Sequence, residues 1–539
     1  MDVDLVIAGP VWTGAGIEQG LAVRGGRVAA VGDAALASRA TAREVVDARA
    51  GLALPAFRDG HVHPPQGGLE EAGPAVREAT TVDAVVASVR AWADRHREAE
   101  WIVGASYDPT LAPDGRFDAR WLDAAVPERP VVLRAADYHT VWCNSEALRR
   151  AGVDAATPDP QIGWIERNPD GSPLGTLREW QACDLVLDAA PSPSAADLEA
   201  ALAWAMRRLA AAGIAWVQDA WVDLGTGILD AYLALAGRGE LAVRAGLALR
   251  ADPLRWREQL EEFVVARRRA EAEGGGQVRA GTVKFFADGV VEGGTAALLD
   301  PYVDATTSGG HSHGMPVWAW PELKEAAAAV DALGLQLHVH AIGDAAVRAA
   351  LDAVEHVAAV NGPRDRRPVI AHAQVVHPDD LPRFGALGVV ANLEPLWAQR
   401  DALMDDLTAP RLGDERTAWQ YPTGTLLRTG ARLSFGSDWP VSSHVPLNGV
   451  RVAVTRTTLD GRPPGGWLPQ ERLTVEQALT AYTAGVAYQA FEDERGVLAV
   501  GSPADVVLLD RDVLRGAPEA VSEARVLGTW LEGRPTHRS

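Results

Sequence analysis

Short apolar runs separated by turn signals mark both ends of the chain. Near the start, the runs Leu21–Arg24 and Arg27–Val31 are joined by two glycines, which is the spacing of hairpins in a small β-sandwich. Near the end, Val506–Leu509 begins a second block of the same kind. We therefore predict that residues 1–55 and 491–539 form the first and second parts of one composite β-sandwich.

Between these ends, stretches with helical periodicity alternate with short apolar strands, the pattern of repeated βα units. Helical stretches at 195–212, 258–273 and 323–333 precede strands at 215–218, 282–286 and 335–340. We predict an α/β fold in which residues 56–490 form a (β/α)8 barrel. The strands that end at His63 and Lys284 lie further apart in the sequence than three βα units require, so we also predict an insertion at about 66–195.

Polar residues stand where the apolar runs of the barrel segment end. His61 and His63 share one face of a strand end, because alternate side chains of a strand point the same way. The other residues that end such runs are Lys284, His340, His372 and Asp438. The carboxyl ends of all strands in a (β/α)8 barrel meet at one rim, so we expect these side chains to form a dinuclear metal site.

The residue types at these positions account for the chemistry of such a site. Neutral imidazole suits zinc, iron or manganese, and a carboxylate adds charge neutralisation. The chain has only two lysines, Lys284 and Lys324, among many arginines. A buried lysine is readily deprotonated, and the neutral amine of Lys284 can add carbon dioxide to form a carbamate that bridges two cations. Asp438 would then take a proton from metal-activated water and pass it to the leaving group.

Alternative interpretations of the same residues remain open from sequence. A single histidine at a strand end is more often structural than a ligand. Lys284 has a rival interpretation as the partner of Asp288 or Glu292 in a buried ion pair, and Asp438 has one as a helix N-cap. His338 shares the strand face of His340; strand alternation does not decide between them, and we favour His340 as the ligand because it lies nearer the rim.

Composition and charge exclude several classes of partner. The formal net charge of −21 argues against nucleic acid and anionic membranes. The first residues lack a basic region followed by a hydrophobic run, and we find no apolar stretch of about 18 residues, so we expect a soluble cytoplasmic protein. Two cysteines are too few for a Cys-rich zinc site. We expect a small-molecule substrate, and homodimerisation is compatible with an acidic barrel enzyme.

The motifs taken together resemble the amidohydrolase superfamily. More narrowly, the chain is similar to the YtcJ-like branch, amidohydrolase family 3, which includes N-substituted formamide deformylase. The segments that carry the resemblance are Asp59–His63, Lys284–Gly289, His340–Asp344, His372–Gln374, Gly436–Val441 and Gly496–Asp505, and, in the inserted region, Asp137–His139 with Trp142–Ser145 and Leu174–Glu179. The chain departs from the family pattern at Ala371, where an acidic residue is frequent, and at Arg58, where a small or apolar residue is usual.

The resemblance implies a distorted (β/α)8 TIM barrel with a composite β-sandwich. It implies metal ligation by His61, His63, Lys284, His340 and His372, with Lys284 carboxylated on its side-chain nitrogen. It also makes Asp438 both a ligand and the general base. The expected cofactor is a pair of zinc ions, with iron or manganese as alternatives.

From these observations we predict a metal-dependent hydrolase that acts on non-peptide carbon–nitrogen bonds, in a small amide or an N-acyl or N-formyl compound. Hydrolysis of a lactone, another ester or a cyclic amidine at the same centre is the alternative within enzymes. A catalytically silent small-molecule binding protein is the alternative outside them. His139, Glu179 and His444 are our candidates for contacts with the substrate.

Overall fold

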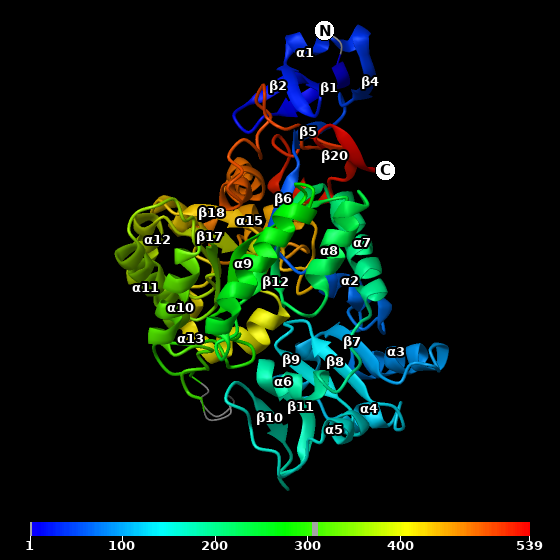
Figure 1. The fold of residues 1–539 in the computed structure, drawn as a ribbon, viewed down its shortest axis with the longest axis vertical. Helices are drawn as coiled ribbons and strands as arrows, with labels where there is room; N and C mark the ends of the chain where they lie inside the picture. The colour runs from blue at the N-terminus through cyan, green and yellow to red at the C-terminus, as the bar shows by residue number, and fades with distance from the viewer. Residues whose placement is uncertain (1–2, 304–310) are drawn as a thin grey trace.

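A computed structural model describes residues 3–303 and 311–539. Its central feature is an eight-stranded parallel sheet that curls into a nearly closed barrel (Figure 1). In chain order its strands are β6 (Phe57–Val62), β12 (Ile214–Val222), β13 (Arg244–Arg250), β14 (Val278–Phe286), β15 (Gln336–Ala341), β16 (Val369–His372), β17 (Val390–Leu393) and β18 (Arg432–Phe435). The predicted α/β barrel is therefore confirmed.

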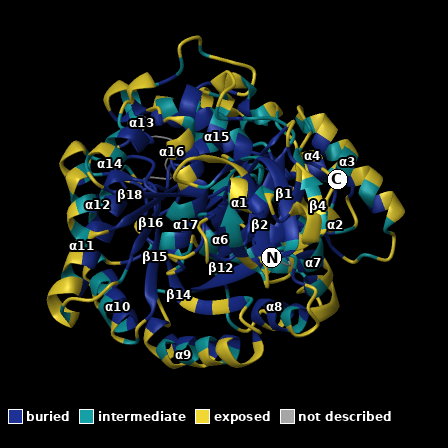
Figure 2. Ribbon diagram, turned by 90° about the horizontal axis from the view of Figure 1, so that it is seen from above, coloured by how far each residue is buried: buried dark blue, intermediate teal, exposed yellow. Residues whose placement is uncertain are grey.

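Helices surround the barrel strands, as Figure 2 shows from one end. The outer helices include α7 (Ala195–Ala211), α8 (Ile228–Gly237), α9 (Trp256–Glu273), α10 (Trp320–Ala332), α11 (Asp344–Asn361), α12 (Leu381–Leu387) and α14 (Thr423–Arg428). Each helix hides its apolar side; in α9, Phe263, Ala266 and Ala270 are buried. The strands are covered on both faces, and β6 and β15 are buried along their whole length.

Strands from the two ends of the chain pair in one further sheet of eight strands. Its members are β1 (Val3–Trp12), β2 (Ile17–Arg24), β3 (Arg27–Val31), β4 (Ala42–Asp47), β5 (Leu52–Pro55), β19 (Val506–Leu509), β20 (Val526–Leu531) and β21 (Arg534–Arg538). The junction is the antiparallel pair of β5 and β19, in which Leu54 lies opposite Val507. Since β5 leads directly into β6, this sheet lies at the amino end of the barrel (Figure 1).

A third sheet is built from the segment between β6 and α7. Its strands are β7 (Ile102–Tyr107), β8 (Val131–Ala135), β9 (Thr140–Cys143), β10 (Trp164–Arg167) and β11 (Pro173–Arg178), and the helices around it are α2 (Pro64–Ala72), α3 (Val82–Arg95), α4 (Ala119–Asp123), α5 (Ser145–Ala151) and α6 (Trp180–Leu187). Phe117 and Trp142 pack in its apolar core, with ring centroids 5.0 Å apart. This sheet lies at the opposite end of the barrel from the terminal sheet (Figure 1), where the barrel strands have their carboxyl ends.

Within residues 3–303 and 311–539, no helix is both long enough and apolar enough to cross a membrane.

A buried ion cluster lies at the amino end of the barrel. Arg58 of β6 and Arg244 of β13 both form buried ion pairs with Glu492. Arg58, which departs from the family pattern, therefore has a structural partner.

Candidate active site

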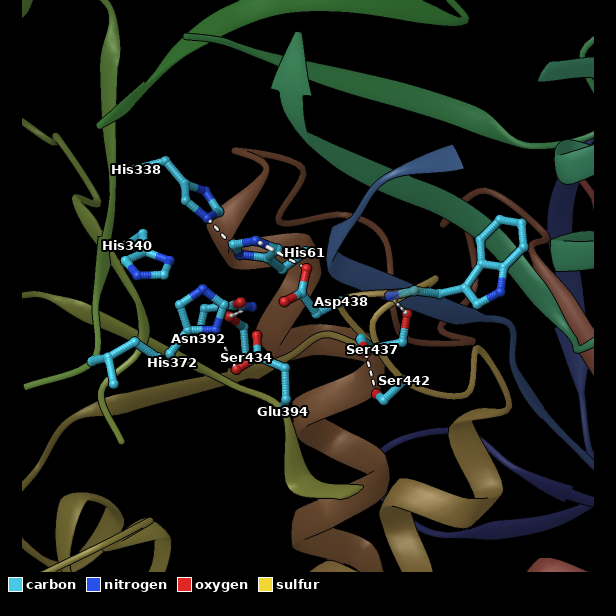
Figure 3. A network of polar contacts seen from close by, with 12 residues as sticks. His61, His338, His340, His372, Asn392, Glu394, Ser434, Ser437, Asp438 and Ser442 are labelled. Carbon is cyan, nitrogen blue, oxygen red and sulfur yellow. Dashed lines mark hydrogen bonds and ion pairs between the residues drawn. The ribbon is translucent and has the colours of Figure 1, made fainter. Parts of the chain in front are cut away.

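The six residues predicted as metal ligands converge at the carboxyl rim of the barrel. His61 lies in β6 and His63 directly after it, Lys284 in β14, His340 in β15 and His372 at the end of β16, while Asp438 follows β18. All six are buried and all six line one pocket. Figure 3 shows His61, His340, His372 and Asp438 grouped together.

Nitrogen and oxygen donors lie close together in this pocket. Asp438 Oδ1 is 2.8 Å from His63 Nε2 and 3.6 Å from His61 Nε2. Ligand atoms of His61, His372 and Asp438 all lie within 4.8 Å of one another. Buried imidazole nitrogens and a carboxylate oxygen that face one another are the donor set that divalent metal ions require, so these residues fit such an ion.

The surroundings of Lys284 bear on the alternative interpretation in which it forms a buried ion pair with Asp288 or Glu292. Its Nζ lies 3.0 Å from His61 Nε2 and 4.7 Å from the centroid of the Phe286 ring. The Asp288 carboxylate instead accepts hydrogen bonds from the backbone N–H groups of Ala297, Ile342 and Gly343. Burial lowers the pKa of Lys284 to about 7, against the opposing charges of Asp438, Glu394 and Asp219. The amine is thus placed among the histidines, and a substantial fraction of it is neutral at pH 7.

His338 and His340 occupy different positions. His338 Nε2 lies 3.0 Å from His61 Nδ1, a contact that Figure 3 shows as a dashed line, so His338 helps to hold the ring of His61. His340 lines the pocket, and its ring centroid is 4.6 Å from that of His372. His340 Nε2 is 3.1 Å from the Gly289 carbonyl oxygen, which leaves Nδ1 as the ring nitrogen available to a ligand.

Burial also sets the charge of these histidines. It holds the pKa values of His61, His338 and His340 well below the usual value for histidine, and the positive charge of Lys284 adds to the effect. Burial opposes ionisation of Asp438 as well, but its hydrogen bond and charge interaction with His63 outweigh this and place its pKa below the ordinary range. The site therefore combines neutral imidazoles at His61, His338 and His340 with an ionised carboxylate at Asp438.

Sequence reasoning missed Glu394, which follows β17 directly. Its Oε2 lies 2.8 Å from His372 Nδ1, and only 1% of the residue is exposed. Because Nδ1 of His372 is engaged, its Nε2 is directed to the pocket. The signal was present, since Glu394 ends an apolar run just as the other rim residues do.

Of the three predicted substrate contacts, His139 lines this pocket, and Glu179 contacts His139 without lining the pocket itself. His139 precedes β9 of the third sheet and lines the pocket, and its Nδ1 lies 2.9 Å from Glu179 Oε2. Burial opposes the charge of His139, but Glu179 outweighs it and raises the His139 pKa to about 9. His444 instead lines a neighbouring pocket with Trp204 and Trp439.

A larger cavity of about 410 Å³ adjoins the pocket. Asp137, Glu292 and Trp397 line both spaces, so they mark the junction between them. The Trp397 indole stacks on His372 with an interplanar angle of 2° and centroids 5.4 Å apart. A cavity of this size beside a polar centre is typical of a small-molecule site.

Comparison with known proteins places this chain among hydrolases. Three relatives align over most of it: Protein LONG AFTER FAR-RED 3 of Arabidopsis thaliana is 32% identical, covering 95% of this chain and 87% of the relative. Putative amidohydrolase YtcJ of Bacillus subtilis (strain 168) is 28% identical, covering 91% and 90%. N-substituted formamide deformylase of Arthrobacter pascens is 27% identical, covering 96% and 94%.

A solved structure shares the architecture. An uncharacterised metal-dependent hydrolase from Pyrococcus furiosus matches with a TM-score of 0.71 and 25% identity, covering 95% of this chain and all of that one. The model of the amidohydrolase family (Amidohydro_3) matches residues 44–537. The resemblance read from the sequence is confirmed: this chain belongs to the amidohydrolase family and is a hydrolase.

Proposed function

We propose that this hydrolase cleaves non-peptide carbon–nitrogen bonds in small amides, in particular N-acyl or N-formyl compounds. The observation that carries the proposal is the meeting of buried imidazole, amine and carboxylate groups from five barrel strands in one pocket. Amides are favoured over esters because a relative aligned over nearly its whole length is named for its action on N-substituted formamides.

The donor set suggests how metal would be held. In our proposal His61, His63, His340, His372 and Asp438 would together hold two ions, and Lys284 would contribute a further ligand as a carbamate. The carbamate forms when the neutral amine adds carbon dioxide and releases a proton. Zinc suits these nitrogen and oxygen ligands, with iron or manganese as alternatives. Bound metal supplies Lewis acidity toward a carbonyl oxygen and lowers the pKa of water.

The protein's own groups then have distinct tasks. Asp438, ionised at neutral pH, takes a proton from the attacking water and delivers it to the leaving amine. His139, held by Glu179, offers an N–H group to the substrate's carbonyl oxygen. Trp180, Trp221 and Phe286 form an apolar wall of the pocket, which limits the access of bulk water to the reacting bond.

A substrate panel tests this proposal. We expect metal-loaded protein to release amine from formamides or N-acyl compounds faster than it opens lactones. Asp438→Asn should lower kcat by about 10²–10⁴-fold, because it removes the general base. The matched control is His356→Ala, on the outer helix α11. Hydrolysis of lactones alone, or unchanged amide turnover by Asp438→Asn, would contradict the proposal.

A further inference from the structure

The cavity beside the histidine pocket carries an excess of negative charge. Among the described residues, the charged groups that line it are Asp108, Asp137, Glu292, Asp401 and a single arginine, Arg77. Arg77 is already paired with Glu70 at 2.8 Å. The lining therefore presents several carboxylates without an equal number of cations, an arrangement that attracts a positively charged group.

Glu292 is the carboxylate at the junction of the two spaces. Three of the acidic groups have local roles: Asp108 and Asp401 accept backbone N–H groups of their own turns, and Asp137 accepts that of His139. Within residues 3–303 and 311–539, no other residue forms a hydrogen bond or ion pair with the Glu292 side chain. Burial and the charge of Asp137 raise its pKa to about 7, although the charges of His139 and Arg411 oppose this. A bound cation would favour its ionised form.

Aromatic groups face the same space. Tyr421 lines the cavity and is only 4% exposed, and no described residue forms a hydrogen bond with its hydroxyl. Trp397, on the junction with Glu292, is held flat against His372. An indole face and a phenol beside a carboxylate are the groups that bind ammonium ions, through cation–π attraction, hydrogen bonding and charge.

We propose that this cavity binds a cationic group of the substrate, an ammonium or amidinium, between Glu292, Trp397 and Tyr421. The inference rests on the proposed function and narrows its substrate class. The preferred amides carry a positive charge on the part of the molecule that extends outward from the scissile bond. Neutral amides of the same size bind less tightly, and anionic ones are repelled.

Three matched substrates test the inference with metal-loaded, full-length protein. They are the mono-N-formyl derivative of an alkane diamine, the N-formyl alkylamine with methyl in place of the ammonium, and the N-formyl amino acid of equal length. We expect kcat/KM to fall in that order, with about tenfold between the first two. Glu292→Gln should reduce that ratio toward one. Asp406 is an exposed carboxylate in the helical segment Met404–Thr408, and Asp406→Asn should leave the ratio unchanged.

A binding measurement separates this inference from the proposed function. Calorimetry with benzylammonium and with the neutral benzyl alcohol needs no turnover. We expect tighter binding of the cation by wild type and a loss of about tenfold in Glu292→Gln. If no amide is hydrolysed but this preference is found, the proposed function fails and the cation site stands. Equal kcat/KM for the cationic and neutral amides, or equal binding of the two probes, would overturn the inference.

Discussion

Two histidines of the rim are held through the ring nitrogen that faces away from the pocket. His372 Nδ1 contacts the Glu394 carboxylate at 2.8 Å, and His61 Nδ1 contacts His338 at 3.0 Å. Partners of this kind fix the tautomer and orientation of a metal-binding imidazole and increase its basicity. Glu394 and His338 therefore act on the proposed metal through the residues they position.

Replacing Glu394 should weaken metal binding without unfolding the barrel. We expect Glu394→Ala to lower the affinity for zinc by about 10–100-fold, because His372 loses the partner that orients it. The zinc affinity of Glu394→Gln should lie between those of wild type and Glu394→Ala, since the glutamine amide oxygen still accepts the Nδ1 proton of His372. Competition with a chromophoric chelator measures the affinity, and Glu415→Ala, exposed on the protein surface, is the control. Equal zinc affinity in wild type and Glu394→Ala would show that the contact has no such role.

The sequence predicted the rim residues because each ends an apolar run, and that signal depends only on local order. It did not separate His338 from His340, since both point to one strand face and only the packing against His61 distinguishes them. Glu394 ends an apolar run in the same way, but its contact with His372 depends on the pairing of neighbouring barrel strands. His444, a predicted substrate contact, lines the neighbouring pocket, and which pocket a loop residue reaches depends on tertiary contacts that local sequence does not encode.

At the scale of elements, a buried ion cluster joins the barrel to the C-terminal segment. Glu492, which follows helix α17 (Val486–Gln489), pairs with Arg58 of β6 and Arg244 of β13, and all three side chains are at most 7% exposed. Burial alone would raise the pKa of Glu492, but the two arginines hold it at about 2. Glu492 lies hundreds of positions from both arginines in the sequence. From sequence alone, Arg58 was therefore only an unexplained departure from the family pattern.

Removing this carboxylate should destabilise the protein. We expect Glu492→Gln to cost about 3–5 kcal/mol, because two buried guanidinium groups lose their shared counter-ion. The folded pKa of about 2 lies below the unfolded value of about 4.3. The stabilisation is thus complete above the unfolded value and is lost as the pH falls toward 2.

Thermal melts of wild type and Glu492→Gln across a pH series measure this effect. The difference in Tm should be constant from neutral pH down to about 5 and should shrink below about 4. Arg27→Gln, which removes an exposed pair with Glu494, should change Tm little at any pH. A Tm for Glu492→Gln equal to that of wild type at neutral pH would contradict this account of the cluster.

Helices with a clear apolar periodicity were predicted well from the sequence, whereas the arrangement of strands in the inserted sheet was not. The helix predicted at 258–273 corresponds to α9, Trp256–Glu273, because its apolar positions recur at helical spacing over several turns. The insertion was expected only as a surplus of length. Its five-stranded sheet depends on β9 pairing with both β8 and β11, and periodicity along one strand does not specify its neighbours.

At the scale of the whole molecule, the two additional sheets lie at opposite ends of the barrel (Figure 1). The terminal sheet covers the amino end, where β5 continues into β6. The inserted sheet covers the carboxyl end and places His139 in the pocket beside the rim histidines. The site is thus a property of the complete fold, since its residues come from five barrel strands and one inserted strand connection.

The most direct test of the proposed metal centre is the metal content of the folded chain. Protein produced with added zinc and bicarbonate should contain about two metal ions per chain by elemental analysis, and Lys284→Ala should retain at most one, because the carbamate bridge cannot form. Wild-type protein without stoichiometric metal would contradict the proposed chemistry. Equal metal content in wild type and Lys284→Ala would exclude the carbamate bridge and leave a centre built on the histidines and Asp438.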